Sequence, residues 1–139
     1  MAKLDSPSLT LLWIGVGGGL GSMARHLASG WVARHWGATF PWGTLLVNVT
    51  GSLVIGLFAA LTAPEGRWLV PATGRQFFMI GVLGGYTTFS SFSLQTLNLV
   101  EEGEWFRAGA NAVLSLVLCM LGVWLGHAIA LAVNTTKGS

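Results

Sequence analysis

Polar groups that could handle an ion interrupt the third long apolar stretch of the chain. Residues 84–93 form a glycine pair followed by hydroxyl, β-branched and aromatic residues, most of which are poor helix formers. We therefore expect a helix to open here. Unwound backbone at membrane depth is tolerated only where protein or a cavity satisfies it, and such broken helices recur at ion sites. Freed carbonyls could bind a cation, whereas freed amides or the hydroxyls of Thr88 and Ser91 could meet an anion.

Two further polar stripes lie in the second and fourth apolar stretches. In each stretch, polar residues follow one another at four-residue steps, which places them on one face of a helix. Such faces could form the walls of a narrow polar track. Alternatively, they could hold helices together, since hydrogen bonds between membrane helices contribute about 0.6–2 kcal/mol each, and Cys119 could be a small buried apolar residue. The two stripes are Thr44, Asn48 and Ser52, and Asn111, Ser115 and Cys119.

Phe89 and Phe92 project to the same side if the helix resumes after Thr88, because they lie three residues apart. The edge of a phenylalanine ring is positive and its face is negative, so rings that lie edge-on can attract an anion. The alternative is that both rings are core aromatics.

These residues must be positioned by membrane-spanning helices. The chain of 139 residues is 53% hydrophobic and 9% charged, whereas a soluble domain carries roughly 25% charged residues. A bilayer core needs about 20 mostly apolar residues in a helix. We predict an all-α membrane protein with a single membrane domain, 1–139, and no affinity for nucleic acid. Its four spans cover about 9–32, 42–62, 77–100 with a break near 85–89, and 108–133.

The basic residues are almost evenly divided between the two sides of such a bundle. Four spans place both termini and the second loop on one side. A chain this small can hardly enclose a pore alone, so we expect an oligomer. Near-equal charge would let the chain insert in both orientations and form an antiparallel two-fold dimer in the lipid. The two groups are Lys3, Arg67, Arg75 and Lys137, and Arg25, Arg34 and Arg107.

Pairs of glycines four residues apart occur in three of the spans. Small residues at this spacing let helix backbones approach closely within a membrane, so we predict that these pairs are packing surfaces. The pairs are Gly15 and Gly19, Gly17 and Gly21, Gly81 and Gly85, and Gly122 and Gly126.

The chain resembles the Fluc (CrcB) family of fluoride channels. The likeness rests on residues 84–93, on residues 43–48 in the second span and on residues 21–25 in the first, and it covers all four spans. It implies an antiparallel, dual-topology homodimer with two narrow pores, passive and selective for fluoride. Such a protein would be multi-pass in the cell inner membrane or plasma membrane and would relieve the cytoplasm of fluoride.

The resemblance also implies roles for individual residues. It assigns the family's paired rings to Phe89 and Phe92, its pore asparagine to Asn48 and its vestibule arginine to Arg25. It implies a structural sodium ion, not transported, held at the dimer centre by main-chain carbonyls of Gly84 and Thr87. The expected fluoride path comprises Asn48, Thr88, Phe89, Ser91, Phe92, Asn111, Ser115 and Cys119.

Three positions depart from the family's pattern. Its fourth span often carries a tyrosine and two serines where this chain has Asn111, Ser115 and Cys119, and the thiol is a weaker donor. Many members have a glutamate where this chain has Gln95.

The main alternative is a proton-coupled exporter of the small multidrug type, which can also be a four-span, dual-topology dimer. Such a carrier needs a membrane-embedded carboxylate, and the predicted spans contain no Asp or Glu. An enzyme is not expected. His127 lies near the end of the fourth span with no evident base, metal cluster or nucleophile beside it, and we interpret it as an interfacial histidine.

Overall fold

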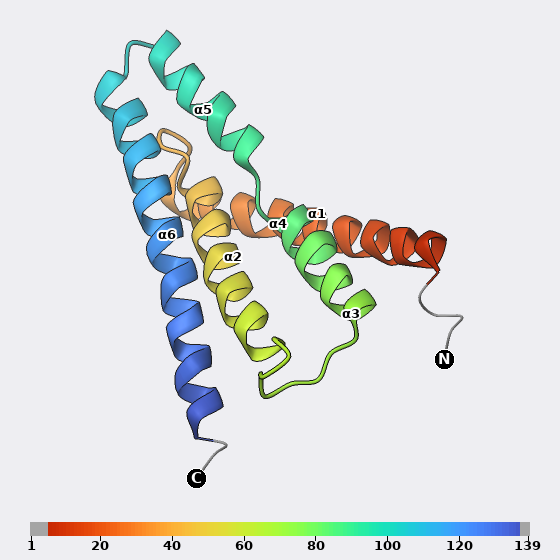
Figure 1. Ribbon diagram of the computed structural model, residues 1–139. Helices are drawn as coiled ribbons and strands as arrows, with labels where there is room; N and C mark the ends of the chain where they lie inside the picture. Colours follow the sequence, from red (N-terminus) through yellow and green to blue (C-terminus); the bar gives the residue numbers. More distant parts are fainter. Residues whose placement is uncertain (1–5, 137–139) are drawn as a thin grey trace.

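The computed structural model describes residues 6–136, which form helices joined by short turns (Figure 1). In chain order the elements are α1 (Pro7–Trp36), α2 (Trp42–Leu61), α3 (Ala72–Gln76), the π-helix η1 (Phe77–Leu83), α4 (Gly84–Tyr86), α5 (Phe89–Glu101) and α6 (Trp105–Thr135). Elements α3, η1 and α4 follow one another without a gap. They therefore form one helical stretch that ends at Tyr86.

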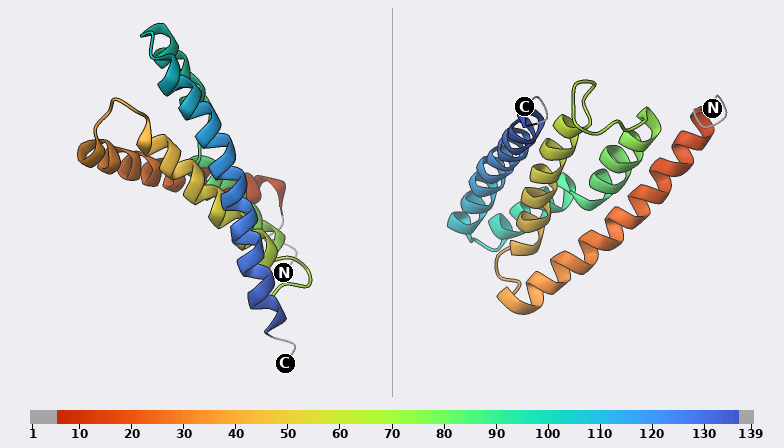
Figure 2. Two further views of the ribbon diagram at one scale, coloured as in Figure 1. Left: turned by 90° about the vertical axis from the view of Figure 1, so that its left-hand side faces the viewer. Right: turned by 90° about the horizontal axis from the view of Figure 1, so that it is seen from below.

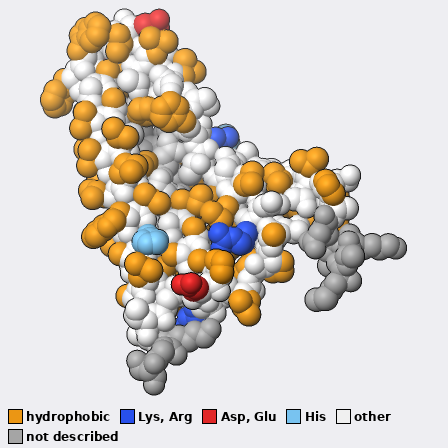
Figure 3. All heavy atoms as spheres, viewed as in Figure 1, with side chains coloured by type: hydrophobic (Ala, Val, Ile, Leu, Met, Phe, Trp, Pro, Cys, Tyr) orange, Lys and Arg blue, Asp and Glu red, His pale blue; other side chains and the backbone are white. Residues whose placement is uncertain are grey.

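Within residues 6–136, three helical stretches are long and apolar enough to cross a membrane: Trp42–Leu61, Ala72–Glu101 and Trp105–Thr135. Three of the four predicted spans are confirmed in this sense. The first, α1, is helical over 30 residues but does not belong to this apolar set. Hydrophobic side chains cover much of the visible surface (Figure 3), as expected for helices that face lipid.

Side chains satisfy free backbone groups at several helix ends. The Ser6 side chain accepts a hydrogen bond from the Leu9 amide at the start of α1, and Gly37 ends that helix with a φ of 83°. At the end of the bundle opposite Gly37, the Arg75 guanidinium donates to the carbonyl and hydroxyl of Thr62, just after α2. Arg67 donates to the carbonyl of Val133 at 3.1 Å near the end of α6.

The helices pack as two pairs (Figures 1 and 2). Helix α2 lies along α6, while η1 and α4 lie along α1. Beyond the break, α5 packs on α6. The third helical stretch thus passes from the α1 side to the α6 side of the molecule at the break between α4 and α5.

Glycines let the backbones touch within both pairs. A Cβ added at Gly126 would meet the carbonyl of Leu53, and one added at Gly21 would meet the carbonyl of Val82. Gly17, Gly81, Gly85 and Gly122 make similar close approaches to backbone atoms, as predicted for packing surfaces. Gly15 and Gly19 differ, because nothing within residues 6–136 lies within 4 Å of a Cβ at either position. Within the described residues, that predicted pair therefore faces open space where a side chain would be.

Candidate ion pathway

The third helical stretch is interrupted at Thr87 and Thr88, inside the range where the sequence predicts a break. Both residues are extended, with ψ angles of 157° and 112°. Asn48 of α2 pairs with the unwound backbone in both directions. Its amide nitrogen donates to the Thr88 carbonyl at 3.0 Å, and its amide oxygen accepts from the Thr88 N–H at 2.7 Å. A side chain thus supplies the hydrogen bonds that the broken helix no longer makes.

The same residues release carbonyls from the helical ladder. The Thr88 N–H would donate to Gly84 in an unbroken helix, but it donates to Asn48 instead. The Ser91 N–H would donate to Thr87, but it donates at 3.2 Å to the Thr88 hydroxyl, which caps α5. The break therefore diverts the carbonyls of Gly84 and Thr87, among those of the last helical turn, from helical bonds.

An inner cavity of about 520 Å³ collects most of the predicted path residues. No described residue that lines it is charged. Its neutral polar groups come from α2, the break and α6, and its rings come from α5. The lining residues used in the argument below are Asn48, Ser52, Gly84, Thr87, Thr88, Phe89, Phe92, Ser115 and Cys119.

Phe89 and Phe92 form one wall of the inner cavity. Their ring centroids lie 5.3 Å apart and their planes are tilted by 56°. Phe92 is partly buried, whereas the side of Phe89 turned away from the cavity is open, since the residue is 79% exposed. The paired placement agrees with the sequence prediction that both rings project to one side.

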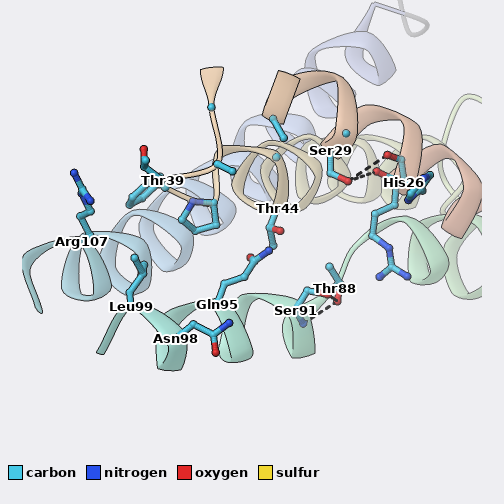
Figure 4. Close-up of a pocket in the computed structure, with 18 of the residues that line it drawn as sticks. His26, Ser29, Thr39, Thr44, Thr88, Ser91, Gln95, Asn98, Leu99 and Arg107 are labelled. Atoms are coloured by element: carbon cyan, nitrogen blue, oxygen red, sulfur yellow. Dashed lines mark hydrogen bonds between the residues drawn. The ribbon is translucent and has the colours of Figure 1, made fainter. Parts of the chain in front are cut away.

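A second, more polar hollow, the outer cleft, has a volume of about 700 Å³ (Figure 4). It lies among α1, the α1–α2 turn, α2 and α5, with His26 towards one end and Arg107 at the other. Arg25 and Glu102 also line it. Thr88 lines both the outer cleft and the inner cavity, and Ser91 lines the cleft. The unwound segment therefore lies between the two hollows.

Arg25 reaches the unwound segment from α1. Its Nη1 donates to the Thr87 carbonyl at 3.3 Å, and the side chain is half-buried in the outer cleft. The Ser29 hydroxyl donates to the Arg25 carbonyl at 2.7 Å, one turn further along α1 (Figure 4). A guanidinium stays protonated in proteins, so this wall of the cleft is positive.

Gln95 extends from α5 towards Thr44 on α2 in the outer cleft (Figure 4). Its Oε1 is buried and has no hydrogen-bond partner. Leaving a buried acceptor unpaired costs about 1–3 kcal/mol.

Asn111 lies apart from the other predicted path residues and lines neither hollow. It is 1% exposed and donates to the hydroxyl of Thr96 on α5 at 2.9 Å. Ser115 donates to its Oδ1 at 3.4 Å. Sequence reasoning missed Thr96, although a hydroxyl four residues after Phe92 on the same helix was a visible signal. It also missed Tyr86, whose hydroxyl pairs with that of Thr50 at 3.0 Å.

The comparisons with known proteins agree with the site. A model of the family described as "CrcB-like protein, Camphor Resistance (CrcB)" matches residues 12–127. A protein of Opitutus terrae named "Fluoride-specific ion channel FluC" is 66% identical over 128 residues, which cover 92% of this chain and 97% of that protein. Proteins of the same name from Methylocella silvestris and Rhodospirillum rubrum are 56% and 57% identical, cover 92% and 91% of this chain, and are themselves covered to 98%. The chain belongs to the CrcB family.

Proposed function

We propose that this chain is a passive, fluoride-selective channel that lets fluoride leave the cell. One structural observation supports this proposal above all others. An unwound segment, held by Asn48, lies between a cleft with a positive wall and a cavity lined by uncharged donors and ring edges. The relatives at 56–66% identity are named as fluoride-specific channels. Family membership and the apolar helices make the chain a multi-pass protein of the cell membrane and not an enzyme.

Fluoride is small and holds its water tightly, so a pore must replace that water with donors of similar strength. Arg25 attracts the anion to the outer cleft, whose volume of about 700 Å³ leaves room for the water that keeps it hydrated. The hydroxyls of Thr88 and Ser91 then meet it at the break, followed by Ser115 and the edges of the rings in the inner cavity. Because no described residue that lines the inner cavity has a cationic side chain, the anion is bound weakly enough to leave.

The functional unit is an antiparallel homodimer with four spans in each chain. Arg67 and Arg75 lie towards one end of the bundle, and Arg34 and Arg107 towards the other, which gives no strong bias in orientation. The predicted contributions of Lys3 and Lys137 lie outside the described residues. A two-fold axis would repeat the path, so the dimer has two pores.

A structural sodium ion suits the carbonyls of Gly84 and Thr87. Hard cations prefer oxygen ligands, and the break diverts these two oxygens from helical bonds. The second copy supplies the same two carbonyls. Thr87 also accepts from Arg25, which leaves one of its lone pairs for an ion. When bound, the cation offsets part of the cost of placing an anion in a low dielectric, without itself moving.

The alternative, a proton-coupled exporter, lacks a chemical basis in the apolar stretches. Glu65, Glu101, Glu102 and Glu104 lie at helix ends or in turns, and Glu104 pairs with Arg107 at 3.3 Å. No described residue that lines the inner cavity carries a carboxylate.

The test is anion efflux from liposomes that contain the purified protein. We expect fluoride efflux that does not depend on a proton gradient, and chloride efflux no faster than in empty liposomes. Equal fluoride and chloride fluxes would overturn fluoride selectivity. Flux coupled to protons, together with export of cationic dyes, would favour the exporter.

A further inference from the structure

Three polar side chains connect α5 with α6 beside the inner cavity. The Thr96 hydroxyl donates to the Phe92 carbonyl at 2.8 Å, one turn earlier in α5. Asn111 Nδ2 donates to the Thr96 oxygen at 2.9 Å, and the Ser115 hydroxyl donates to Asn111 Oδ1 at 3.4 Å. Ser115 alone of the three lines the inner cavity.

The direction of each bond in this chain follows from the first. A hydroxyl has one proton, and that of Thr96 goes to the Phe92 carbonyl, so Thr96 can only accept from Asn111. The atom of Asn111 that faces Thr96 must then be the amide nitrogen, which fixes the orientation of the amide. The amide oxygen faces Ser115 and cannot donate. The hydrogen bond between these two residues, at 3.4 Å, must therefore run from the Ser115 hydroxyl to the Asn111 oxygen.

This direction matters because Ser115 faces the proposed path. A hydroxyl attracts an anion through its proton and repels it through its lone pairs. With the proton committed to Asn111, the Ser115 oxygen turns its lone pairs to the inner cavity. For fluoride to bind there, the hydroxyl must leave Asn111 and rotate.

We propose that Thr96 and Asn111 are positioning residues that hold the Ser115 hydroxyl away from the fluoride path and so keep the Ser115 site weak. The inference rests on the proposed function and deepens it. A hydrogen bond to a charged acceptor is stronger than one to a neutral carbonyl. An arriving fluoride can therefore replace the Asn111 oxygen as the acceptor of the Ser115 hydroxyl. When the ion leaves, the proton returns to Asn111. Binding that is weak enough for exit is what conduction requires.

The experiment measures initial fluoride efflux against fluoride concentration in liposomes. Thr96→Val removes the acceptor that orients the amide, which allows Asn111 to turn its nitrogen to Ser115 and frees the Ser115 proton. We expect the half-saturating fluoride concentration to fall by about twofold to tenfold, the value of one hydrogen bond. Thr96→Ser keeps the hydroxyl and should behave as the unaltered protein. Asn111→Leu removes the oxygen that competes with fluoride for the Ser115 proton. It should therefore also lower the half-saturating fluoride concentration.

The matched background is Ser115→Ala, which removes the hydroxyl that the other two residues are proposed to orient. In that background Thr96→Val should leave the half-saturating concentration unchanged, whereas a merely structural role for Thr96 would shift it equally in both backgrounds. An equal shift, or no shift when Ser115 is present, overturns the inference. Unaltered protein that passes fluoride and chloride equally overturns the proposed function as well, so the two failures are distinguishable.

Discussion

Asn48 illustrates how one residue can make a broken helix tolerable. A carboxamide has the same donor and acceptor as a peptide group, and Asn48 presents both to Thr88 from the neighbouring helix. Serine and threonine offer a single proton and so could not donate to the carbonyl and accept from the N–H with two separate atoms. Asn48, which is one of the residues that line the inner cavity, thus also holds the break open.

Asn48→Ala is predicted to destabilise the protein by about 1–3 kcal/mol, because two partly buried hydrogen bonds are lost. Fluoride efflux should fall with it. Thermal unfolding in detergent measures the first effect, and liposome efflux measures the second. The matched control is Asn98→Ala, an exposed asparagine that lines the outer cleft on α5. Equal losses in both variants would contradict the role given to Asn48.

Phe92→Ile is predicted to reduce fluoride efflux by roughly tenfold or more, because isoleucine fills similar space without a positive ring edge. The control is Phe106→Ile on α6, which changes an aromatic residue that is 88% exposed and lines neither hollow. Fluoride efflux that survives the change at Phe92 would remove the ring edges from the mechanism.

At the scale of elements, α2 packs along α6 and carries Asn48, the residue that pairs with the unwound segment. The two helices touch at the backbone, with Gly56 against the Val123 carbonyl and Gly126 against the Leu53 carbonyl. Asn48 and Ser115 face the inner cavity from this pair. Backbone contact leaves little room for sliding, so the donors on the two helices keep their relative positions.

Gly126→Val is predicted to separate α2 from α6 and to cost about 1–3 kcal/mol or more, because the new side chain meets a backbone carbonyl that cannot move aside. Gly109→Val is the control on the same helix, where a Cβ meets nothing within 4 Å. Unfolding in detergent should separate the two variants. A Gly109 variant as unstable as the Gly126 variant would show that helix propensity dominates over packing.

The elements themselves could be predicted because apolar length, turn residues and glycine spacing are local signals. The predicted second span, 42–62, and the observed helix α2, Trp42–Leu61, differ by one residue. Helix α1 extends past the predicted end at residue 32 because Gly37, with its positive φ, is the residue that ends it. The π-helix η1 was not predicted. It lies where Gly81 packs on Gly17 of α1, a contact that no local pattern reveals.

Contacts between residues far apart in the sequence also limit how much of the site could be predicted. The stripe spacing predicts Asn48 and Ser115 as walls of one polar track, and both residues line the inner cavity. The pairing of Asn48 with Thr88 spans 40 residues, and the turn of Asn111 towards Thr96 depends on how α5 lies on α6. Both are products of packing between helices and are absent from the pattern along either helix.

At the scale of the whole molecule, one chain leaves its path incomplete. Phe89 is 79% exposed although it lines the inner cavity, and a Cβ added at Gly15 or Gly19 would meet nothing within 4 Å among the described residues. The carbonyls of Gly84 and Thr87 alone are also too few to surround a hard cation. These features agree with a second copy placed across a two-fold axis.

The dimer predicts that protein purified in mild detergent has twice the mass of one chain of 14.6 kDa. Light scattering with correction for bound detergent measures this mass. Dual topology further predicts that a label at the amino terminus is reached from both sides of a membrane in comparable amounts. A single-chain mass would contradict the dimer, and labelling from one side alone would contradict dual topology.

The central claim is that an unwound segment and uncharged donors replace the water of fluoride. An experimental structure of the protein equilibrated with fluoride tests it most directly. The account predicts fluoride density in the inner cavity, beside the edges of Phe89 and Phe92 and within hydrogen-bond distance of Ser115 or Thr88. A continuous third helix with both rings turned to lipid, and no density in that cavity, would contradict it.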